Sequence, residues 1–151
     1  NMDKWIWLDM DGTFVDLYGV DGWLLDLVSF NTRPYREAMP IYNMADLILL
    51  LMELKKKDWK IGIISWLSKN PDVEYGKKVT KTKTEWLLSW CMDCVLDKIL
   101  IVPYGQCKAD TCRQFGYGIL ADDEEQNRNA WDLGDTIDAN KNLLEELAKL
   151  L

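Results

Sequence analysis

Short, almost wholly apolar segments recur along this chain, and amphipathic helical patterns separate them. The apolar segments span residues 4–9, 59–65, 98–102 and 117–121, with a briefer one at 136–137. Runs of this length favour buried β-strands, and the stretches between them are long enough for helices. Strands that alternate with helices form βαβ units, which place the strands in one parallel sheet with both faces covered. We therefore expect an α/β fold with three α/β/α layers and a mostly parallel central sheet of about five strands.

The helices are expected between and after these strands. Their patterns cover residues 43–57, 73–91, 125–131 and 143–151, with a shorter helix that starts at Asp21 or Gly22 and runs to residue 28. Asn43 has the side chain of a helix N-cap. Pro34 and Pro40 are expected to interrupt regular structure before the second helix. A chain of 151 residues suits a single domain, so we expect one unit over residues 1–151.

The sequence contains no histidine, and this excludes several kinds of catalytic site. Ser-His-Asp and Cys-His systems, phosphohistidine intermediates and histidine-ligated metals all need that side chain. Acid–base catalysis then falls to carboxylates, Lys, Tyr or Cys. The formal net charge of -7 also argues against general binding of duplex nucleic acid, for which proteins use basic surfaces.

Segments that direct a protein to a membrane are absent from the pattern. The longest apolar run, residues 47–52, is far shorter than the roughly 20 residues of a membrane span. No basic stretch followed by an apolar one opens the sequence. We expect a cytoplasmic protein with no membrane partner. The sequence specifies no oligomeric state, and a homo-oligomer stays open.

Four cysteines allow three interpretations. A CxxC pair followed by a second pair is compatible with a four-thiolate zinc site. Because the CxxC lies within a helical pattern rather than on a turn, we favour reduced, partly buried thiols. A disulfide is the third interpretation. The residues concerned are Cys91, Cys94, Cys107 and Cys112.

Polar side chains follow the expected strands where a parallel sheet binds its ligands, outside the carboxyl ends of the strands. Singly, such residues often form turns, caps or solvated surface, but together at successive strand ends they favour a site. Clustered carboxylates repel each other and require a cation, and oxygen ligands suit Mg²⁺ beside a phosphate. The pattern therefore indicates metal-assisted phosphoryl transfer. The residues, in strand order, are Asp9 and Asp11, then Ser65, then Lys108, then Asp122 and Asp123.

Four ordered motifs, which span nearly the whole chain, resemble those of the haloacid dehalogenase superfamily of phosphatases. They are WIWLDMDGTFVDLYGV, IGIISWLS, VPYGQCKAD and GILADDEEQN. A looser resemblance, in KTEWL followed by KILIVPYG and ILADD, is to the 5'(3')-deoxyribonucleotidase branch. The resemblance implies a Rossmann-like fold and a Mg²⁺-dependent phosphomonoester hydrolase that acts on a nucleotide or other small phosphate. It also implies a reaction through an aspartyl-phosphate intermediate. The alternatives are a phosphatase acting on a macromolecule, such as a nucleic-acid phosphate end, and a non-catalytic interaction protein.

The resemblance also implies residue roles. Asp9 would be the nucleophile and Asp11 the general acid and base. Residues two apart in an extended segment point the same way, which lets both reach one site. Mg²⁺ would be held by the carboxylates of Asp9 and Asp122 and the backbone carbonyl of Asp11, with Asp123 and Asn127 in support. The phosphoryl group would be bound by Gly12, Thr13, Ser65, Trp66 and Lys108, of which Lys108 also serves catalysis by neutralising charge.

The intervals between motifs leave no room for a full cap domain over the site. Residues 18–40 form a possible minimal lid, and its aromatic rings either pack in the core, which we favour, or stack on a nucleobase. A lysine run is interpreted as a solvated helix face, with guidance of a nucleotide to the site as the alternative. These lysines are Lys77, Lys78, Lys81 and Lys83, and further candidate substrate contacts are Arg33, Arg36 and Lys69.

Overall fold

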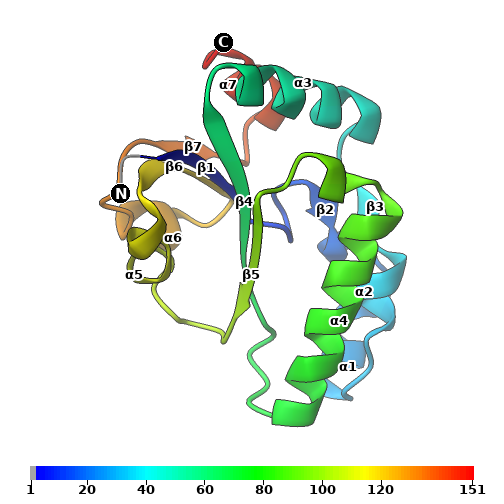
Figure 1. The fold of residues 1–151 in the computed structure, drawn as a ribbon. Helices are drawn as coiled ribbons and strands as arrows, with labels where there is room; N and C mark the ends of the chain where they lie inside the picture. The colour runs from blue at the N-terminus through cyan, green and yellow to red at the C-terminus, as the bar shows by residue number, and fades with distance from the viewer. Residues whose placement is uncertain (1–2) are drawn as a thin grey trace.

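A five-stranded sheet with all strands parallel forms the centre of the structure, a computed structural model that describes residues 3–151 (Figure 1). The strand order is β5–β4–β1–β6–β7. The predicted architecture and all five strands are confirmed, with end points that differ from the predicted ones by no more than one residue. The strands are β1 (Lys4–Leu8), β4 (Trp59–Trp66), β5 (Lys98–Val102), β6 (Tyr117–Asp122) and β7 (Thr136–Asp138).

Helices cover both faces of this sheet, which gives the three predicted layers. Asn43 caps the second predicted helix as expected, since its side chain accepts a hydrogen bond from the backbone N–H of Asp46. Two short helices, α2 and α5, are not predicted. The helices are α1 (Trp23–Val28), α2 (Arg33–Glu37), α3 (Met44–Lys56), α4 (Val73–Ser89), α5 (Lys108–Cys112), α6 (Glu125–Asn129) and α7 (Leu143–Ala148).

Alternate side chains of β1 face the two helical layers. Ile6 and Leu8 belong to the larger apolar core, with residues of α3, α4 and α7. Trp5 and Trp7 face the side of α5 and α6, where their rings stack with centroids 4.6 Å apart. Because successive strand residues point to opposite faces, a strand covered on both sides must be apolar at nearly every position. This requirement explains why KWIWL predicts a central strand.

Trp7 needs space in the neighbouring strand, and Gly62 provides it. A Cβ atom at Gly62 would lie 2.3 Å from Cζ3 of the Trp7 ring. Within residues 3–151, Nε1 of Trp7 is also a buried side-chain donor without a hydrogen-bond partner. The large ring is therefore fitted into the sheet by a glycine rather than anchored by a polar contact.

The segment between β1 and α3, named the α1–α2 segment, is more regular than the sequence predicts. Two short strands, β2 (Val15–Asp16) and β3 (Met39–Pro40), form an antiparallel pair, and α1 and α2 lie between them in the chain. Pro34 lies in the first turn of α2, and Pro40 lies in a two-residue edge strand. A missing N–H is tolerated at both kinds of position. The expectation that these prolines interrupt regular structure is therefore wrong.

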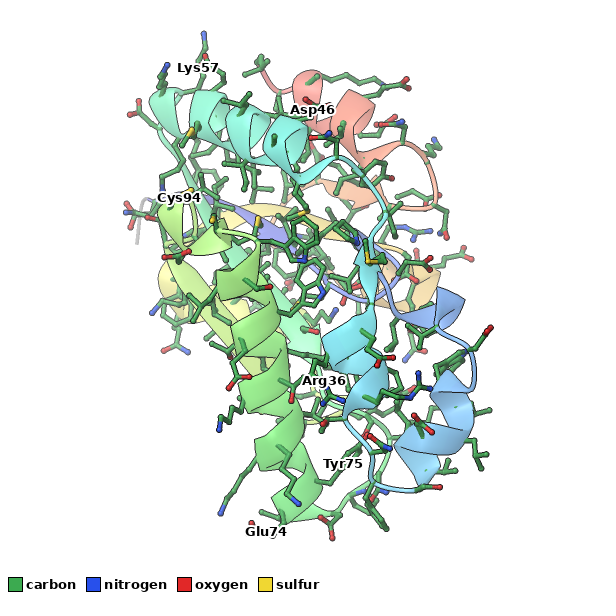
Figure 2. The ribbon with its side chains drawn as sticks, turned by 90° about the vertical axis from the view of Figure 1, so that its right-hand side faces the viewer. Arg36, Asp46, Lys57, Glu74, Tyr75 and Cys94 are labelled. Carbon is green, nitrogen blue, oxygen red and sulfur yellow. The ribbon has the colours of Figure 1, made fainter. Side chains whose placement is uncertain are left out.

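This segment is anchored to the long helix α4. Leu27 and Tyr35 are buried together with Tyr75 and Val79 of α4. The hydroxyl of Tyr75 also donates a hydrogen bond to the carbonyl oxygen of Asn31 at 2.8 Å. Figure 2 shows α4 beside α2, with Tyr75 pointing from α4 toward the α1–α2 segment. The segment is thus held at a fixed place beside the carboxyl end of the sheet.

The helix α4 ends two residues earlier than predicted. Cys91 has a left-handed backbone conformation, with a φ of 61°, and a 3-10 turn over Met92–Cys94 follows it. The prediction that the CxxC lies within a helix is therefore wrong. The four cysteines are free thiols, with Cys91 exposed and Cys112 buried, and residues 3–151 do not bring four thiolates together. Across the same residues, no helix combines the length and apolar composition needed to cross a membrane.

Candidate active site

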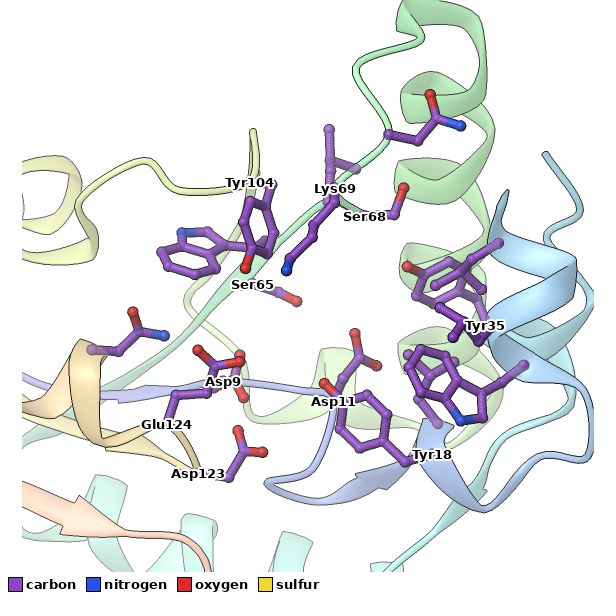
Figure 3. A pocket seen from close by; sticks show the side chains of 18 of the residues that line it. Asp9, Asp11, Tyr18, Tyr35, Ser65, Ser68, Lys69, Tyr104, Asp123 and Glu124 are labelled. Atoms are coloured by element: carbon purple, nitrogen blue, oxygen red, sulfur yellow. The ribbon is translucent and has the colours of Figure 1, made fainter. Parts of the chain in front are cut away.

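The carboxyl ends of three adjacent strands meet at a cavity of about 640 Å³ (Figure 3). Asp9 directly follows β1, Ser65 is the penultimate residue of β4, and Asp122 ends β6. The strand β1 pairs in parallel with both β4 and β6, so their carboxyl ends emerge on the same edge. All three residues line the cavity. The sequence prediction of a shared site at this edge agrees with that placement.

Asp9 is held by two side chains. The hydroxyl of Thr13 donates a hydrogen bond to Oδ2 of Asp9 at 3.0 Å. Nζ of Lys108, the first residue of α5, donates to Oδ1 of Asp9 at 2.9 Å and to Oδ2 of Asp122 at 2.6 Å. Burial disfavours the charge of Lys108, but the two carboxylates outweigh burial and raise its pKa. The ammonium group of Lys108 is therefore a permanent charge between Asp9 and Asp122.

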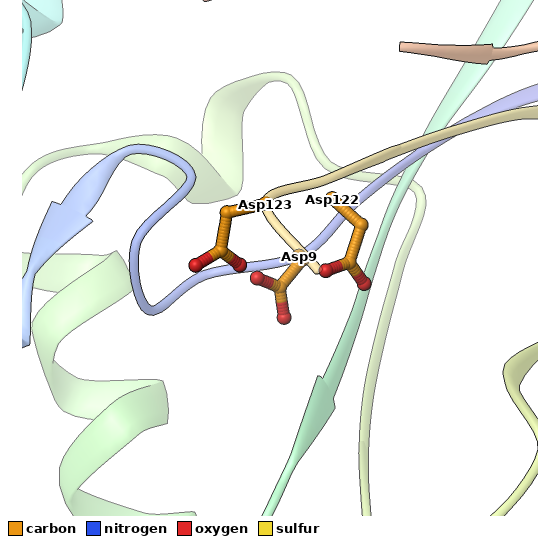
Figure 4. A group of neighbouring side chains, drawn as sticks. All are labelled: Asp9, Asp122 and Asp123. Atoms are coloured by element: carbon orange, nitrogen blue, oxygen red, sulfur yellow. The ribbon is translucent and has the colours of Figure 1, made fainter. Parts of the chain in front are cut away.

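Two further carboxylates lie close to that of Asp9 (Figure 4). One oxygen from each of Asp9, Asp122 and Asp123 lies within 4.8 Å of the others. Burial, followed by the charge of Asp9, raises the pKa of Asp123 to about 8 and also raises that of Asp122. Three ionised carboxylates would carry more negative charge than Lys108 compensates, so without a cation the group holds protons more tightly than isolated carboxyl groups do. Hard, closely spaced oxygen donors with unbalanced charge fit Mg²⁺.

Neighbouring residues fix the positions of these carboxylates. The side-chain amide of Asn127 donates a hydrogen bond to Oδ2 of Asp122 at 3.0 Å. Gly12 has a φ of +82°, and a Cβ atom there would lie 2.2 Å from Oδ2 of Asp123. Glycine is therefore required at position 12, both for its backbone conformation and for the close approach of Asp123.

The carboxylate of Asp11 lies outside this group and pairs with a different lysine. Nζ of Lys83, from α4, donates hydrogen bonds at 2.8 Å to Oδ2 of Asp11, to the hydroxyl oxygen of Ser65 and to the carbonyl oxygen of Trp66. Burial raises the pKa of Asp11, although Lys83 opposes that rise. Since Lys83 donates to the Ser65 oxygen, the hydroxyl proton of Ser65 remains able to donate to a ligand.

The interpretation of Lys83 as part of a solvated or substrate-guiding lysine run is wrong. Its side chain is only 1% exposed, whereas the neighbouring lysines Lys77 and Lys81 are exposed. The sequence does contain a signal for this burial. Tyr75, Val79 and Lys83 recur every four residues on one face of α4, so Lys83 occupies an apolar-face position.

The remaining predicted residues divide into those that line the cavity and those that do not. Trp66 and Lys69 line it. Gly12 and Thr13 are not among the lining residues and act instead on Asp123 and Asp9. Arg33 and Arg36 do not line it either, and Arg33 pairs with acidic side chains of the α1–α2 segment.

These features define a haloacid-dehalogenase-like α/β fold, in which acidic residues follow β1 and β6 at the carboxyl edge of the sheet. A similar fold occurs in the crystal structure of a D,D-heptose 1.7-bisphosphate phosphatase from B. bronchiseptica, complexed with magnesium and phosphate. The two chains are 15% identical, the TM-score is 0.55, and the match covers 94% of this chain and 86% of that one. No protein-family model and no curated protein matches the sequence. At this identity the likeness concerns the fold alone.

Proposed function

We propose that this protein is a Mg²⁺-dependent phosphomonoester hydrolase in which Asp9 is the nucleophile. The observation that carries the proposal is the convergence of Asp9, Lys108, Ser65 and two further carboxylates in one cavity at the sheet edge. The structural neighbour is a phosphatase complexed with magnesium and phosphate, which agrees with this reaction class. The proposed substrate is a nucleotide or another small phosphate.

The reaction would proceed in two displacements. An oxygen of Asp9 attacks phosphorus and forms an aspartyl phosphate, while the bond from phosphorus to the leaving oxygen breaks and Asp11 gives that oxygen a proton. Asp11 then takes a proton from water as the water oxygen attacks the same phosphorus. Inorganic phosphate leaves and the Asp9 carboxylate is regenerated. The raised pKa of Asp11 favours the protonated form that the first displacement needs.

The surrounding residues would orient these groups and neutralise charge. Lys108 stabilises negative charge on Asp9 and on the transferred group, and the hydroxyl of Ser65 donates to a phosphoryl oxygen. Lys83 orients the carboxylate of Asp11. Mg²⁺ would be held by the carboxylates of Asp9, Asp122 and Asp123 and by the backbone carbonyl of Asp11. When bound, the ion would neutralise charge on the phosphoryl group.

The test is hydrolysis of a panel of phosphomonoesters by the purified protein with Mg²⁺. We expect turnover that is lost with EDTA and in Asp9→Asn. Asp58→Asn is the matched control, because Asp58 is exposed at the opposite edge of the sheet and its left-handed backbone (φ 70°) suits asparagine. Hydrolysis that survives Asp9→Asn would refute the nucleophile assignment. Comparing a mononucleotide with a phosphorylated oligonucleotide separates a small substrate from a macromolecular one.

A further inference from the structure

The cavity extends well beyond the residues that would bind a phosphoryl group. Its volume of about 640 Å³ falls within the range of about 300–1,000 Å³ that small-molecule sites occupy. Figure 3 shows Asp9 on one side of the cavity and Tyr35 on the other, and residues of α1 also line it. The space toward α1 is continuous with the proposed phosphate site and is large enough for the rest of the substrate.

The helix α1 lines the cavity with two apolar stripes, and one of them is also packed against α4. Leu27 is buried against α4, and Trp23, one turn earlier, packs on the same cluster. Leu24 and Val28 form a second stripe, also one turn apart, which lines the cavity while each residue stays 59% exposed. Large apolar side chains left open inside a ligand cavity are covered favourably by an apolar ligand group.

The same wall offers little to a polar leaving group. Six cavity-lining residues come from positions 17–28, and of these only Tyr18 and Trp23 carry a polar side-chain atom. A polyhydroxylated leaving group would exchange its contacts with water for few hydrogen bonds there, which is unfavourable. An apolar ring would lose no hydrogen bonds and would cover Leu24 and Val28.

Resting on the proposed function, we infer that the substrate is the phosphomonoester of an alcohol that carries an apolar, ring-sized group. That group packs on the α1 stripe formed by Leu24 and Val28, while the phosphoryl group lies at Asp9. Leu24 and Val28 are thus specificity-determining residues, and the segment that carries them selects the leaving group without belonging to the catalytic machinery.

The experiment compares 2-phenylethyl phosphate with glycerol 3-phosphate. Both esters have primary alcohol leaving groups, so the comparison isolates recognition from intrinsic reactivity. We expect kcat/KM to be at least about tenfold higher for the phenylethyl ester, and to fall about tenfold for that ester alone in Leu24→Ser and in Val28→Ser. Leu25→Ser is the matched control, because Leu25 is 69% exposed on the same helix and does not line the cavity.

Equal kcat/KM values for the two esters, or a preference that Leu24→Ser leaves unchanged, would overturn the inference while Asp9-dependent hydrolysis still supports the proposed function. If neither ester is hydrolysed, the phosphomonoester panel decides the proposed function separately, and calorimetric binding of the two esters to Asp9→Asn decides the inference. Tighter binding of the phenylethyl ester that weakens in Leu24→Ser would support the apolar site. Equal or undetectable binding of the two esters would overturn it.

Discussion

Replacing Lys83 with methionine removes the buried ammonium group while keeping an unbranched apolar chain. The ammonium makes three hydrogen bonds of 2.8 Å, to Asp11, Ser65 and Trp66. The side chains of Lys83 and Asp11 are 1% and 15% exposed, so water screens their attraction little. Breaking a buried pair costs about 3–5 kcal/mol, because the remaining charge keeps its desolvation penalty. Since Asp11 also borders the cavity, we expect the lower value, a loss of about 3 kcal/mol in unfolding free energy.

This loss should depend on pH, because it arises from the charged form of Asp11. Burial raises the pKa of Asp11 and Lys83 opposes the rise, so Lys83→Met raises that pKa further. Below the unfolded-state pKa of about 4, such a carboxyl group is protonated in both the folded and the unfolded state and costs no stability. As pH rises from there through the raised folded-state pKa, the unfolded state loses the proton more readily, so the free energy of unfolding falls. The difference between wild type and variant is therefore small in acid and largest at neutral to alkaline pH.

The assay is urea unfolding of the metal-free protein, followed by circular dichroism between about pH 4 and pH 8. Lys81→Met is the control, because Lys81 is 79% exposed on the same helix and its ion pair with Glu85, at 3.8 Å, stabilises by about 0.5 kcal/mol at most. In the double variant with Asp11→Asn, the loss caused by Lys83→Met should shrink. Equal losses in Lys83→Met and Lys81→Met, or a loss independent of pH, would refute the reasoning.

Three further predictions concern the metal, the thiols and the sheet. Mg²⁺ at one hundred times its Kd should stabilise the wild type by about 2.7 kcal/mol, or about 5–10 °C in Tm, and stabilise Asp122→Asn far less. Equal Tm shifts of the wild type and Asp122→Asn in a thermal scan would contradict the metal site. A thiol reagent should modify the exposed Cys91 in the folded protein. It should modify Cys112 only after unfolding, because burial raises the pKa of that thiol to about 12. Peptide mass spectrometry distinguishes the two sites, and labelled Cys112 in the folded protein would contradict its burial. Gly62→Ala should lower unfolding free energy by about 1–3 kcal/mol through overpacking against Trp7; urea unfolding midpoints equal to wild type would show that the ring moves aside freely.

The central sheet could be predicted because its strands are covered on both faces. A strand such as KWIWL contains apolar residues on both sides, and few other structures accommodate such a run between polar turns. Apart from α1, whose apolar pattern predicts a short helix, the α1–α2 segment lacks a comparable signal. Its regular elements are only two to six residues long, and they depend on tertiary contacts such as the hydrogen bond from Nε1 of Trp86 to the carbonyl oxygen of Ala38. Local patterns do not encode contacts of that kind.

The same contrast holds for the candidate site. Some of its residues are positioned by a strand end, whereas Lys83 is positioned by its hydrogen-bond partners. Asp9 and Asp122 could be predicted because the ends of parallel strands share an edge. For Lys83 the helical spacing signals burial, but its partner could not be predicted, because lysine is ordinarily solvated and its burial is stable only beside an acceptor such as Asp11. The dependence is mutual, since Lys83 in turn limits how far burial raises the pKa of Asp11. A substitution at either residue therefore changes both the stability of the fold and the proton affinity of the proposed acid. Neither effect can be predicted from one of the two residues alone.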